Sequence, residues 1–325
     1  MARHLSTVCI QIILAIIQLV LPILAARAID SPLSGGLVSE KDIQLLNCAL
    51  YIEHMESALY TQALSRFSVK NFTDAGLEPW TYGRFQEILE HENSHVQFLQ
   101  NTVSKAGGRP IGPCTYNFSL DASDPLSFVE LASRLETIGT AAYHGVSTML
   151  TNEQSISASG VVFEIEARHS GWIDASVRKV SAWSGAFGVP LNCGQVLTLL
   201  SSYIESCPSR DSELSPLPKP YPPLTISNTR PNEMASLSFT PPDNFNTNTS
   251  ASFSVTFLTS NAGMLSVPID VQDDSEKPVQ VRIPENIQGD AFVIITNNAK
   301  DVSDESILAG PALLRVTSED DSMRT

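Results

Sequence analysis

Hydrophobic and polar residues follow two different patterns along this chain. From about 39 to 206, hydrophobic residues recur every three or four positions, as in helices with one buried face. From 224 to 317, short runs alternate hydrophobic and polar residues, as strands do. The segment between these parts is rich in proline, which cannot continue a helix and favours an extended spacer. We therefore predict three parts beyond the amino terminus: a helical domain at 29–207, a linker at 208–223 and a β domain at 224–325.

The first part predicts four long helices, at 40–66, 79–105, 125–151 and 158–184. Ser39 is a suitable cap for the first helix, and Pro79 opens the second. Asp124 and Pro125 suit the start of the third. The connection between the second and third helices has about 20 residues, whereas the other two connections are short, and this order is typical of a four-helix bundle with one crossover.

The second part predicts an antiparallel β-sandwich. Runs with strand-like alternation occur at 236–239, 252–258, 279–283, 291–295 and 312–316. Turn-rich breaks separate them at the spacing expected of such a sandwich. The predicted fold class is therefore α+β and multidomain, with a helical bundle followed by a carboxyl-terminal β-sandwich.

Residues 1–28 are predicted to be a signal peptide. Val8–Ala26 is nearly all apolar, and 26–28 places alanines at the two positions that a signal peptidase reads. An uncleaved membrane anchor is the competing interpretation, because the apolar run is long for a signal peptide. With either interpretation we expect the rest of the chain outside the cytosol, in the extracellular space or the cell wall. After cleavage we expect no membrane association.

Four cysteines follow the predicted signal peptide: Cys48, Cys114, Cys193 and Cys207. In an oxidising compartment we expect them to form two disulfides. A predicted helix at 195–206 would hold Cys193 and Cys207 roughly 20 Å apart, whereas a disulfide needs Cα atoms within about 7 Å. These two cysteines should therefore pair with Cys48 and Cys114, in an order that stays open. Glycosylation tripeptides begin at Asn71, Asn117 and Asn248.

The chain is strongly acidic. It has 35 Asp and Glu against 20 Lys and Arg, a formal charge of −15. Removal of Arg3 and Arg27 with the signal peptide would change this charge to −17. Such a surface repels phosphate backbones, and no basic cluster offsets it, which excludes nucleic acid as a partner. Cations remain suitable partners.

The candidate chemistry lies in a repeated pattern on the four helices. The second and fourth helices contain Glu-x-x-His, at Glu92–His95 and Glu166–His169. At this spacing the carboxylate and the imidazole share one helix face and can bind one cation together. The first and third helices contain a glutamate seven positions before a tyrosine, at Glu53–Tyr60 and Glu136–Tyr143. The alternating order indicates an internal duplication of a helix pair.

The phase of these acids indicates that they point into the bundle. Glu53 follows Leu46 and Ala49 on one hydrophobic stripe, and the other three helices have the same arrangement. Several ionised carboxylates in one core would cost many kcal/mol unless they were protonated or bound to cations. Divalent metal ions would solve this problem. Two alternatives stay open: acids on a solvated face, and a metal-free relic whose acids are partly protonated.

Other polar residues near these stripes have less defined roles. Glu56 shares the stripe of Glu53 and is expected to be either a ligand or a neighbour of the ligands. Tyr60 and Tyr143 are candidates to hold ligand carboxylates through their hydroxyls, or are ordinary core tyrosines. The remaining histidines lie off the stripes and are expected to be surface or structural residues: His54, His91 and His144.

The pattern resembles the ferritin-like superfamily of di-iron and di-manganese carboxylate proteins. That family uses one Glu from each of two helices and Glu-x-x-His from each of the other two. The resemblance implies a centre of two iron or manganese ions per chain, with Glu92 and Glu166 bridging. It assigns one ion to Glu53, Glu92 and His95, and the other to Glu136, Glu166 and His169.

Three segments, 46–60, 135–143 and 306–314, are similar to secreted fungal ferritin-like proteins associated with stress response and late sexual development. These proteins are related to plant desiccation-related proteins. Carboxylates with one imidazole per metal suit iron or manganese better than a closed zinc site, and open positions would admit O₂ or peroxide. The resemblance thus implies a ferroxidase-like oxidase or a manganese catalase-like protein in stress or development. The alternative is a metal-free structural protein of the cell wall or extracellular matrix, binding wall polymer or itself through the β domain.

Overall fold

The computed structural model describes residues 38–121, 123–208, 217–227, 230–240, 253–269 and 278–316. From Val38 onward the chain belongs to one compact unit. The predicted signal peptide, the glycosylation tripeptide at Asn248 and part of the predicted linker lie outside the described residues. Asn71 and Asn117 are both exposed, and their glycosylation stays a prediction.

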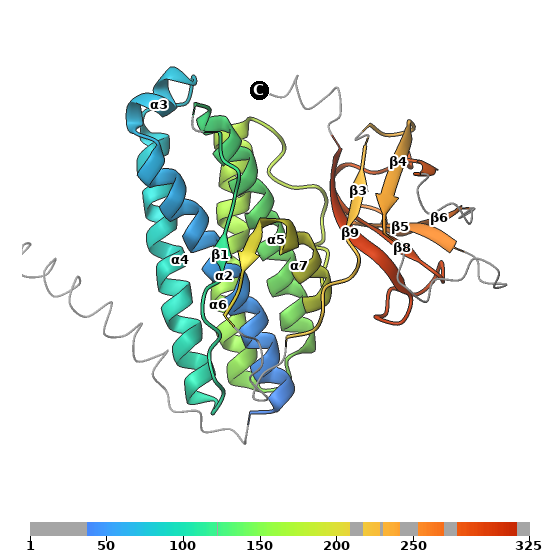
Figure 1. Cartoon of the computed structure of the whole chain (residues 1–325), viewed down its shortest axis with the longest axis horizontal. Helices are drawn as coiled ribbons and strands as arrows, with labels where there is room; N and C mark the ends of the chain where they lie inside the picture. The colour runs from blue at the N-terminus through green and yellow to red at the C-terminus, as the bar shows by residue number, and fades with distance from the viewer. Residues whose placement is uncertain are drawn as a thin grey trace, which may run out of the picture. The chain divides into compact units, whose positions relative to one another are not determined.

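Four long helices form the first part of the described chain (Figure 1): α2 (Glu40–Arg66), α4 (Trp80–Lys105), α5 (Pro125–Met149) and α6 (Glu153–Trp172). Helix α2 packs against α4 and α5, and α5 packs against α6. The predicted helical bundle is therefore confirmed. The long connection between α4 and α5 is the predicted crossover.

Local sequence explains where these helices begin. The Ser39 side chain accepts a hydrogen bond from the Asp42 amide, and Asp124 accepts one from Leu126 ahead of α5. The predicted start of the fourth helix at residue 158 is wrong, because the Asn152 side chain caps it and α6 begins at Glu153. The buried Asp42 carboxylate also accepts the Asn152 amide, at 2.8 Å, which ties the start of α2 to the α5–α6 turn.

Several short elements complete the helical part: α3 (Val69–Asp74), the π-helix η1 (Ile173–Arg178), α7 (Cys193–Leu200), the 3₁₀ helix η2 (Ser201–Tyr203), β1 (Thr115–Tyr116) and β2 (Ile204–Ser206). The predicted helix at 195–206 is therefore too long at its carboxyl end. Strand β2 instead pairs antiparallel with β1 in the crossover.

The last part of the chain forms two antiparallel sheets, as predicted. The three-stranded sheet has the order β3–β4–β7, from Leu224–Ile226, Met234–Phe239 and Val279–Arg282. The four-stranded sheet has the order β6–β5–β8–β9, from Gly263–Ile269, Phe253–Thr259, Gly289–Thr296 and Ile307–Val316. One hydrophobic cluster joins the two sheets and includes Leu237, Phe257 and Leu314, all fully buried. Strands β3 and β6 were missed, because β3 has only three residues and β6 contains Pro268 and a weak alternation.

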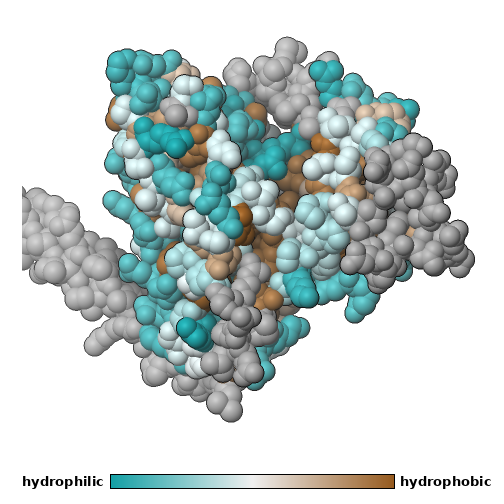
Figure 2. Space-filling model, in the orientation of Figure 1, coloured by the Kyte–Doolittle hydropathy of each residue, from teal (hydrophilic) through white to brown (hydrophobic). Residues whose placement is uncertain are grey.

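The sheets and the helices contact each other within the compact unit. Phe292 of β8 and Leu313 of β9 belong to the same hydrophobic cluster as the helical core. Arg315 of β9 donates to Ser133 and Thr137 of α5, at 2.7 and 3.0 Å. Figure 2 shows hydrophobic side chains gathered where helical segments and the sheet meet, with mostly hydrophilic side chains over the helices elsewhere on this face.

Two disulfides are present, Cys48–Cys193 and Cys114–Cys207, with Cα separations of 6.0 and 4.2 Å. The prediction that Cys193 and Cys207 do not pair with each other is confirmed, and the open order is resolved. Cys48–Cys193 joins α2 to α7, whereas Cys114–Cys207 joins the crossover to the chain after β2. Among the described residues, no helix has the length and hydrophobicity to cross a membrane.

Loss of Cys114–Cys207 is expected to destabilise the protein measurably. This disulfide spans 93 residues of sequence, so it restricts the unfolded chain over a long loop, and removal should lower the free energy of unfolding by about 2–5 kcal/mol. Guanidinium denaturation of the Cys114→Ala/Cys207→Ala variant would measure this. An unchanged denaturation midpoint in the variant would show that the disulfide contributes nothing to stability.

Candidate metal centre

Seven ionisable side chains from all four long helices meet inside the bundle: Glu53 and Glu56 of α2, Glu92 and His95 of α4, Glu136 of α5, and Glu166 and His169 of α6. The five glutamates are 0% exposed. The structure therefore brings together every residue that the sequence assigned to the two metal ions, with Glu56 beside them. The interpretation of these acids as a solvated face is wrong.

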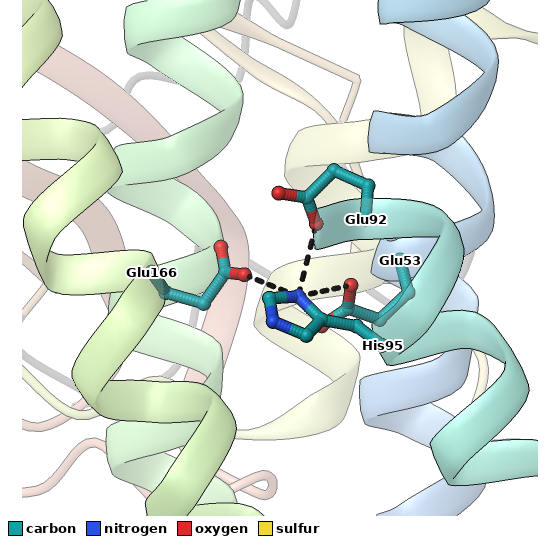
Figure 3. Close-up of side chains that lie close together, drawn as sticks. All are labelled: Glu53, Glu92, His95 and Glu166. Atoms are coloured by element: carbon teal, nitrogen blue, oxygen red, sulfur yellow. Dashed lines mark hydrogen bonds and ion pairs between the residues drawn. The ribbon is translucent and has the colours of Figure 1, made fainter. Parts of the chain in front are cut away.

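His95 is the centre of the first group of donors. Its Nδ1 atom lies near three carboxylate oxygens: Glu166 Oε1 at 3.1 Å, Glu92 Oε2 at 3.2 Å and Glu53 Oε2 at 3.3 Å. Figure 3 shows the three glutamates pointing toward this imidazole from α2, α4 and α6. Each residue thus presents at least one donor atom to the same small space.

His169 occupies the equivalent position in the second group. Its Nδ1 atom lies 3.0 Å from Glu92 Oε1 and 3.4 Å from Glu136 Oε2. Glu92 therefore presents one oxygen to each histidine. The two groups whose donor atoms lie close enough to hold a cation share two members, Glu92 and Glu166.

The donor set fits divalent metal. Oxygen and nitrogen donors at about 2.1 Å from one ion lie about 3.0–3.4 Å apart at octahedral or tetrahedral angles, which is the range of the separations from His95 and His169. Both oxygens of Glu56 and Oε2 of Glu166 have no hydrogen-bond partner. Four other carboxylate oxygens have only an imidazole nitrogen nearby, at 3.0–3.4 Å: Glu53 Oε2, Glu92 Oε1, Glu136 Oε2 and Glu166 Oε1. Buried polar atoms without partners are costly, and metal ligation would satisfy those that it reaches.

Two tyrosines hold the outer carboxylates in a reciprocal arrangement. Tyr60 of α2 donates to Glu136 of α5, and Tyr143 of α5 donates to Glu53 of α2. Each hydroxyl satisfies one oxygen and leaves the other, Oε2, facing a histidine. This symmetry matches the duplication in the sequence and gives both tyrosines a positioning role beyond core packing.

Glu56 lies at the edge of this arrangement. Gly139 of α5 faces it, and a Cβ atom there would lie 2.7 Å from Glu56 Oε1 and 3.1 Å from Glu166 Oε2. A larger residue at 139 would therefore push into both carboxylates. Glu56 belongs to neither four-residue donor group, so the structure places it next to the candidate ligands rather than among them.

The acids have divergent pKa values. Burial raises the pKa of Glu53 to about 8, and hydrogen bonding to His95 only partly opposes this. Burial and the charge of neighbouring glutamates raise the pKa of Glu56 and Glu166 well above the usual range. Burial also disfavours ionisation of Glu92, but hydrogen bonds from His169 and His95 outweigh it and lower its pKa to about 2. Protons therefore neutralise part of the cluster when no cation is bound.

Both histidines bind protons tightly in this environment. Burial lowers the pKa of His169, but the charge of Glu136 and hydrogen bonds to Glu136 and Glu92 outweigh it and raise the pKa to about 11. The pKa of His95 rises further, because hydrogen bonds to Glu166, Glu53 and Glu92 outweigh its desolvation. A metal ion must displace these protons in order to bind.

His91 lies against His169, a contact that was not predicted from the sequence. His91 Nδ1 lies 3.0 Å from His169 Nε2, and the two ring planes differ by 8°. His91 precedes His95 by one helical turn of α4, and this spacing is the signal that was overlooked. The other two histidines lie away from the cluster: His54 Nε2 is 3.1 Å from the Ile111 carbonyl oxygen, and the His144 ring lies parallel to Phe163.

Comparison with known families agrees with this geometry. Residues 41–179 match the family described as ferritin-like domain. This part of the chain is a ferritin-like domain. The ferritin-like domain contains all seven clustered residues, and its carboxylates and histidines can hold metal.

Two individual proteins are similar to this chain. Protein rds1 of Schizosaccharomyces pombe is 23% identical over 192 residues, which are 54% of this chain and 42% of rds1. The similarity thus spans less than half of that relative. A conserved hypothetical protein from Mycobacterium tuberculosis, rv2844, has a crystal structure that is 19% identical and covers 47% of this chain and 100% of that chain, with a TM-score of 0.36.

Proposed function

We propose that the ferritin-like domain binds a dinuclear iron or manganese centre. The observation that supports this is the sharing of Glu92 and Glu166 between two donor groups. In this proposal Glu53 and His95 complete the site of one ion, and Glu136 and His169 complete the other. Glu92 and Glu166, which belong to both groups, would help to hold both ions, as the family pattern implies. Hard carboxylate donors with one imidazole per ion favour iron or manganese over a closed zinc site.

Bound metal would supply electron transfer in pairs and open positions for O₂ or peroxide. The protein would contribute the rest of the chemistry. Tyr60 and Tyr143 orient the outer carboxylates, and full burial of the five glutamates excludes bulk water. Glu56, with its raised pKa, would hold a proton beside the candidate ligands. We infer an oxidase-type role from this combination.

Metal stoichiometry tests the proposal directly. After reconstitution with Fe(II) or Mn(II), we expect elemental mass spectrometry to find about two ions per chain. Zinc alone at one ion per chain would contradict the dinuclear assignment. A protein that contains no iron, manganese or zinc after reconstitution would instead favour the structural alternative. In that alternative the sheets bind wall polymer or other copies of the chain.

Two assays separate the reactions that such a centre permits. Oxygen consumption with added Fe(II) would indicate a ferroxidase-like oxidase, whereas oxygen release from peroxide by the manganese form would indicate catalase-like activity. If a protein with two ions per chain showed neither activity, the oxidase-type role would be contradicted. The proposal of a metal centre would be unaffected.

We further propose that the protein is extracellular or attached to the cell wall. The two disulfides favour an oxidising compartment, and the predicted signal peptide supplies a route. A protective role in stress or development rests on the resemblance to secreted fungal ferritin-like proteins. Detection of the protein only in the cytosol of its source cells would contradict this localisation.

The tyrosine hydroxyls offer a test of how the ligands are positioned. Tyr143→Phe removes the hydrogen bond to Glu53 without changing the shape of the core. Loss of a partner that orients a ligand weakens metal binding by about 10–100-fold, and Tyr60→Phe should act alike through Glu136. Titration with Mn(II) would measure these affinities. An unchanged affinity in both variants would show that the tyrosines are ordinary core residues.

A further inference from the structure

The two donor groups of the candidate metal centre contain the same kinds of side chain. We call them the His95 site (Glu53, Glu92, His95 and Glu166) and the His169 site (Glu92, Glu136, Glu166 and His169). In each site a tyrosine hydroxyl holds one oxygen of the unshared glutamate, and its other oxygen faces the histidine. Because the donors match, a difference between the two ions is expected to come from the side chains that surround the donors.

The outer nitrogens of the two histidines have different surroundings. His169 presents Nδ1 to its glutamates, and its Nε2 lies 3.0 Å from His91 Nδ1. His95 also presents Nδ1 to its glutamates, but no group of the described residues forms a hydrogen bond with its Nε2. The His95 side chain is 12% exposed, which leaves water as the partner of that nitrogen. One imidazole therefore has a fixed outer partner and the other has a mobile one.

The sequence duplication is broken at the residue that makes this difference. His91 lies one residue before the glutamate of the first Glu-x-x-His motif, and Ile165 lies one residue before the glutamate of the second. An isoleucine side chain has no group that donates or accepts hydrogen bonds. Helix α6 thus has no imidazole at the position equivalent to that of His91 on α4.

The contact between His91 and His169 has the geometry of a hydrogen bond in the plane of the rings. The ring planes differ by 8°, and the ring centroids lie 5.2 Å apart, with 3.0 Å between the facing nitrogens. The rings therefore meet edge to edge rather than face to face. A neutral histidine that binds metal through Nδ1 carries its proton on Nε2. His169 would then donate this proton to His91 Nδ1.

We propose that His91 is a positioning residue that makes the His169 site bind its ion more tightly than the His95 site does. The inference rests on the proposed dinuclear centre. A fixed outer partner sets the tautomer and orientation of a ligand imidazole and raises its basicity. Loss of such a partner weakens metal binding by about 10–100-fold. The His169 site should therefore be filled first when the chain holds a single ion.

The test titrates the full chain with Mn(II) and follows unbound Mn(II) by electron paramagnetic resonance, which gives an affinity for each of two binding steps. Two variants of nearly equal size differ in one property. His91→Asn places an acceptor oxygen near the position of Nδ1, whereas His91→Leu has no acceptor and keeps water out. The leucine variant should weaken the first step by about 10–100-fold and leave the second nearly unchanged. The asparagine variant should keep most of the first-step affinity.

Controls separate this effect from folding and from the metal centre itself. His91 is exposed, so neither substitution should lower the Tm of the metal-free protein. Gln97→Leu changes another exposed residue of α4 and should leave both steps unchanged. An unchanged first step in His91→Leu, or equal losses in its leucine and asparagine variants, would overturn the positioning role while two ions per chain still supported the dinuclear centre. A wild-type chain that binds no Mn(II) would overturn both.

Discussion

Replacing Glu92 and Glu166 together with glutamine is expected to reduce the metal content from about two ions per chain to nearly none. Both residues belong to both donor groups, so the double variant removes an anionic donor from each site at the same time. A neutral amide is a weaker ligand than a carboxylate and has nearly the same shape. Elemental mass spectrometry after reconstitution with Fe(II) or Mn(II) measures the loss.

The same variant separates metal binding from structural support. In the metal-free protein, loss of the ionised Glu92 deprives two protonated histidines of a partner and should lower stability, whereas replacement of the protonated Glu166 should cost little. The Tm of the double variant should no longer rise when metal is added. If the double variant does not fold, the single variant Glu166→Gln, which keeps Glu92 beside both histidines, should fold and still bind less metal than the wild type.

A matched control lies on the same helices. Glu90 of α4 and Glu164 of α6 lie two residues before the shared ligands and are exposed. The double variant Glu90→Gln/Glu164→Gln removes the same number of charges from the same helices and should keep the full metal content. Equal metal loss in both double variants would contradict the assignment, since net charge alone would then explain binding.

The bundle and the inward direction of its acids could be predicted because both depend on local periodicity. Glu53, Glu92, Glu136 and Glu166 each replace a hydrophobic residue in a stripe of helical spacing, and all four are buried. The caps at Ser39 and Asp124 are equally local. The sharing of Glu92 between two histidines, by contrast, required the family resemblance, because spacing within a helix does not tell which helices face each other.

Features that depend on contacts between distant segments were not predictable. The order of the disulfides depends on where the crossover and α7 lie against α2, which no local pattern records. The hydrogen bond between His91 and His169 joins α4 to α6, and the hydrogen bonds from Arg315 join β9 to α5. The parts of the site that lie on one helix face could thus be predicted from the sequence, whereas the parts where separate elements meet could not.

The metal-free protein is expected to lose stability as pH rises from about 6.5 to 8. The pKa of Glu53 rises from 4.5 to about 8 on folding, and that of His169 from 6.5 to about 11. Over this interval these two groups bind more protons in the folded chain than in the unfolded chain. Each group can therefore contribute a decrease in the free energy of unfolding of up to about 1.4 kcal/mol per pH unit.

Metal should reverse this dependence. An ion that binds the unprotonated forms of Glu53 and His169 displaces their protons, so its affinity rises with pH. The difference in Tm between the Mn(II)-loaded protein and the protein in chelator should then widen from pH 6.5 to 8. Calorimetry in both conditions measures it, and Glu53→Gln should flatten the slope of the metal-free protein because one of the titrating groups is gone. If the Tm in chelator rose across this interval, the buried acids would be ionised without metal. The electrostatic argument for a cation at this site would then be contradicted.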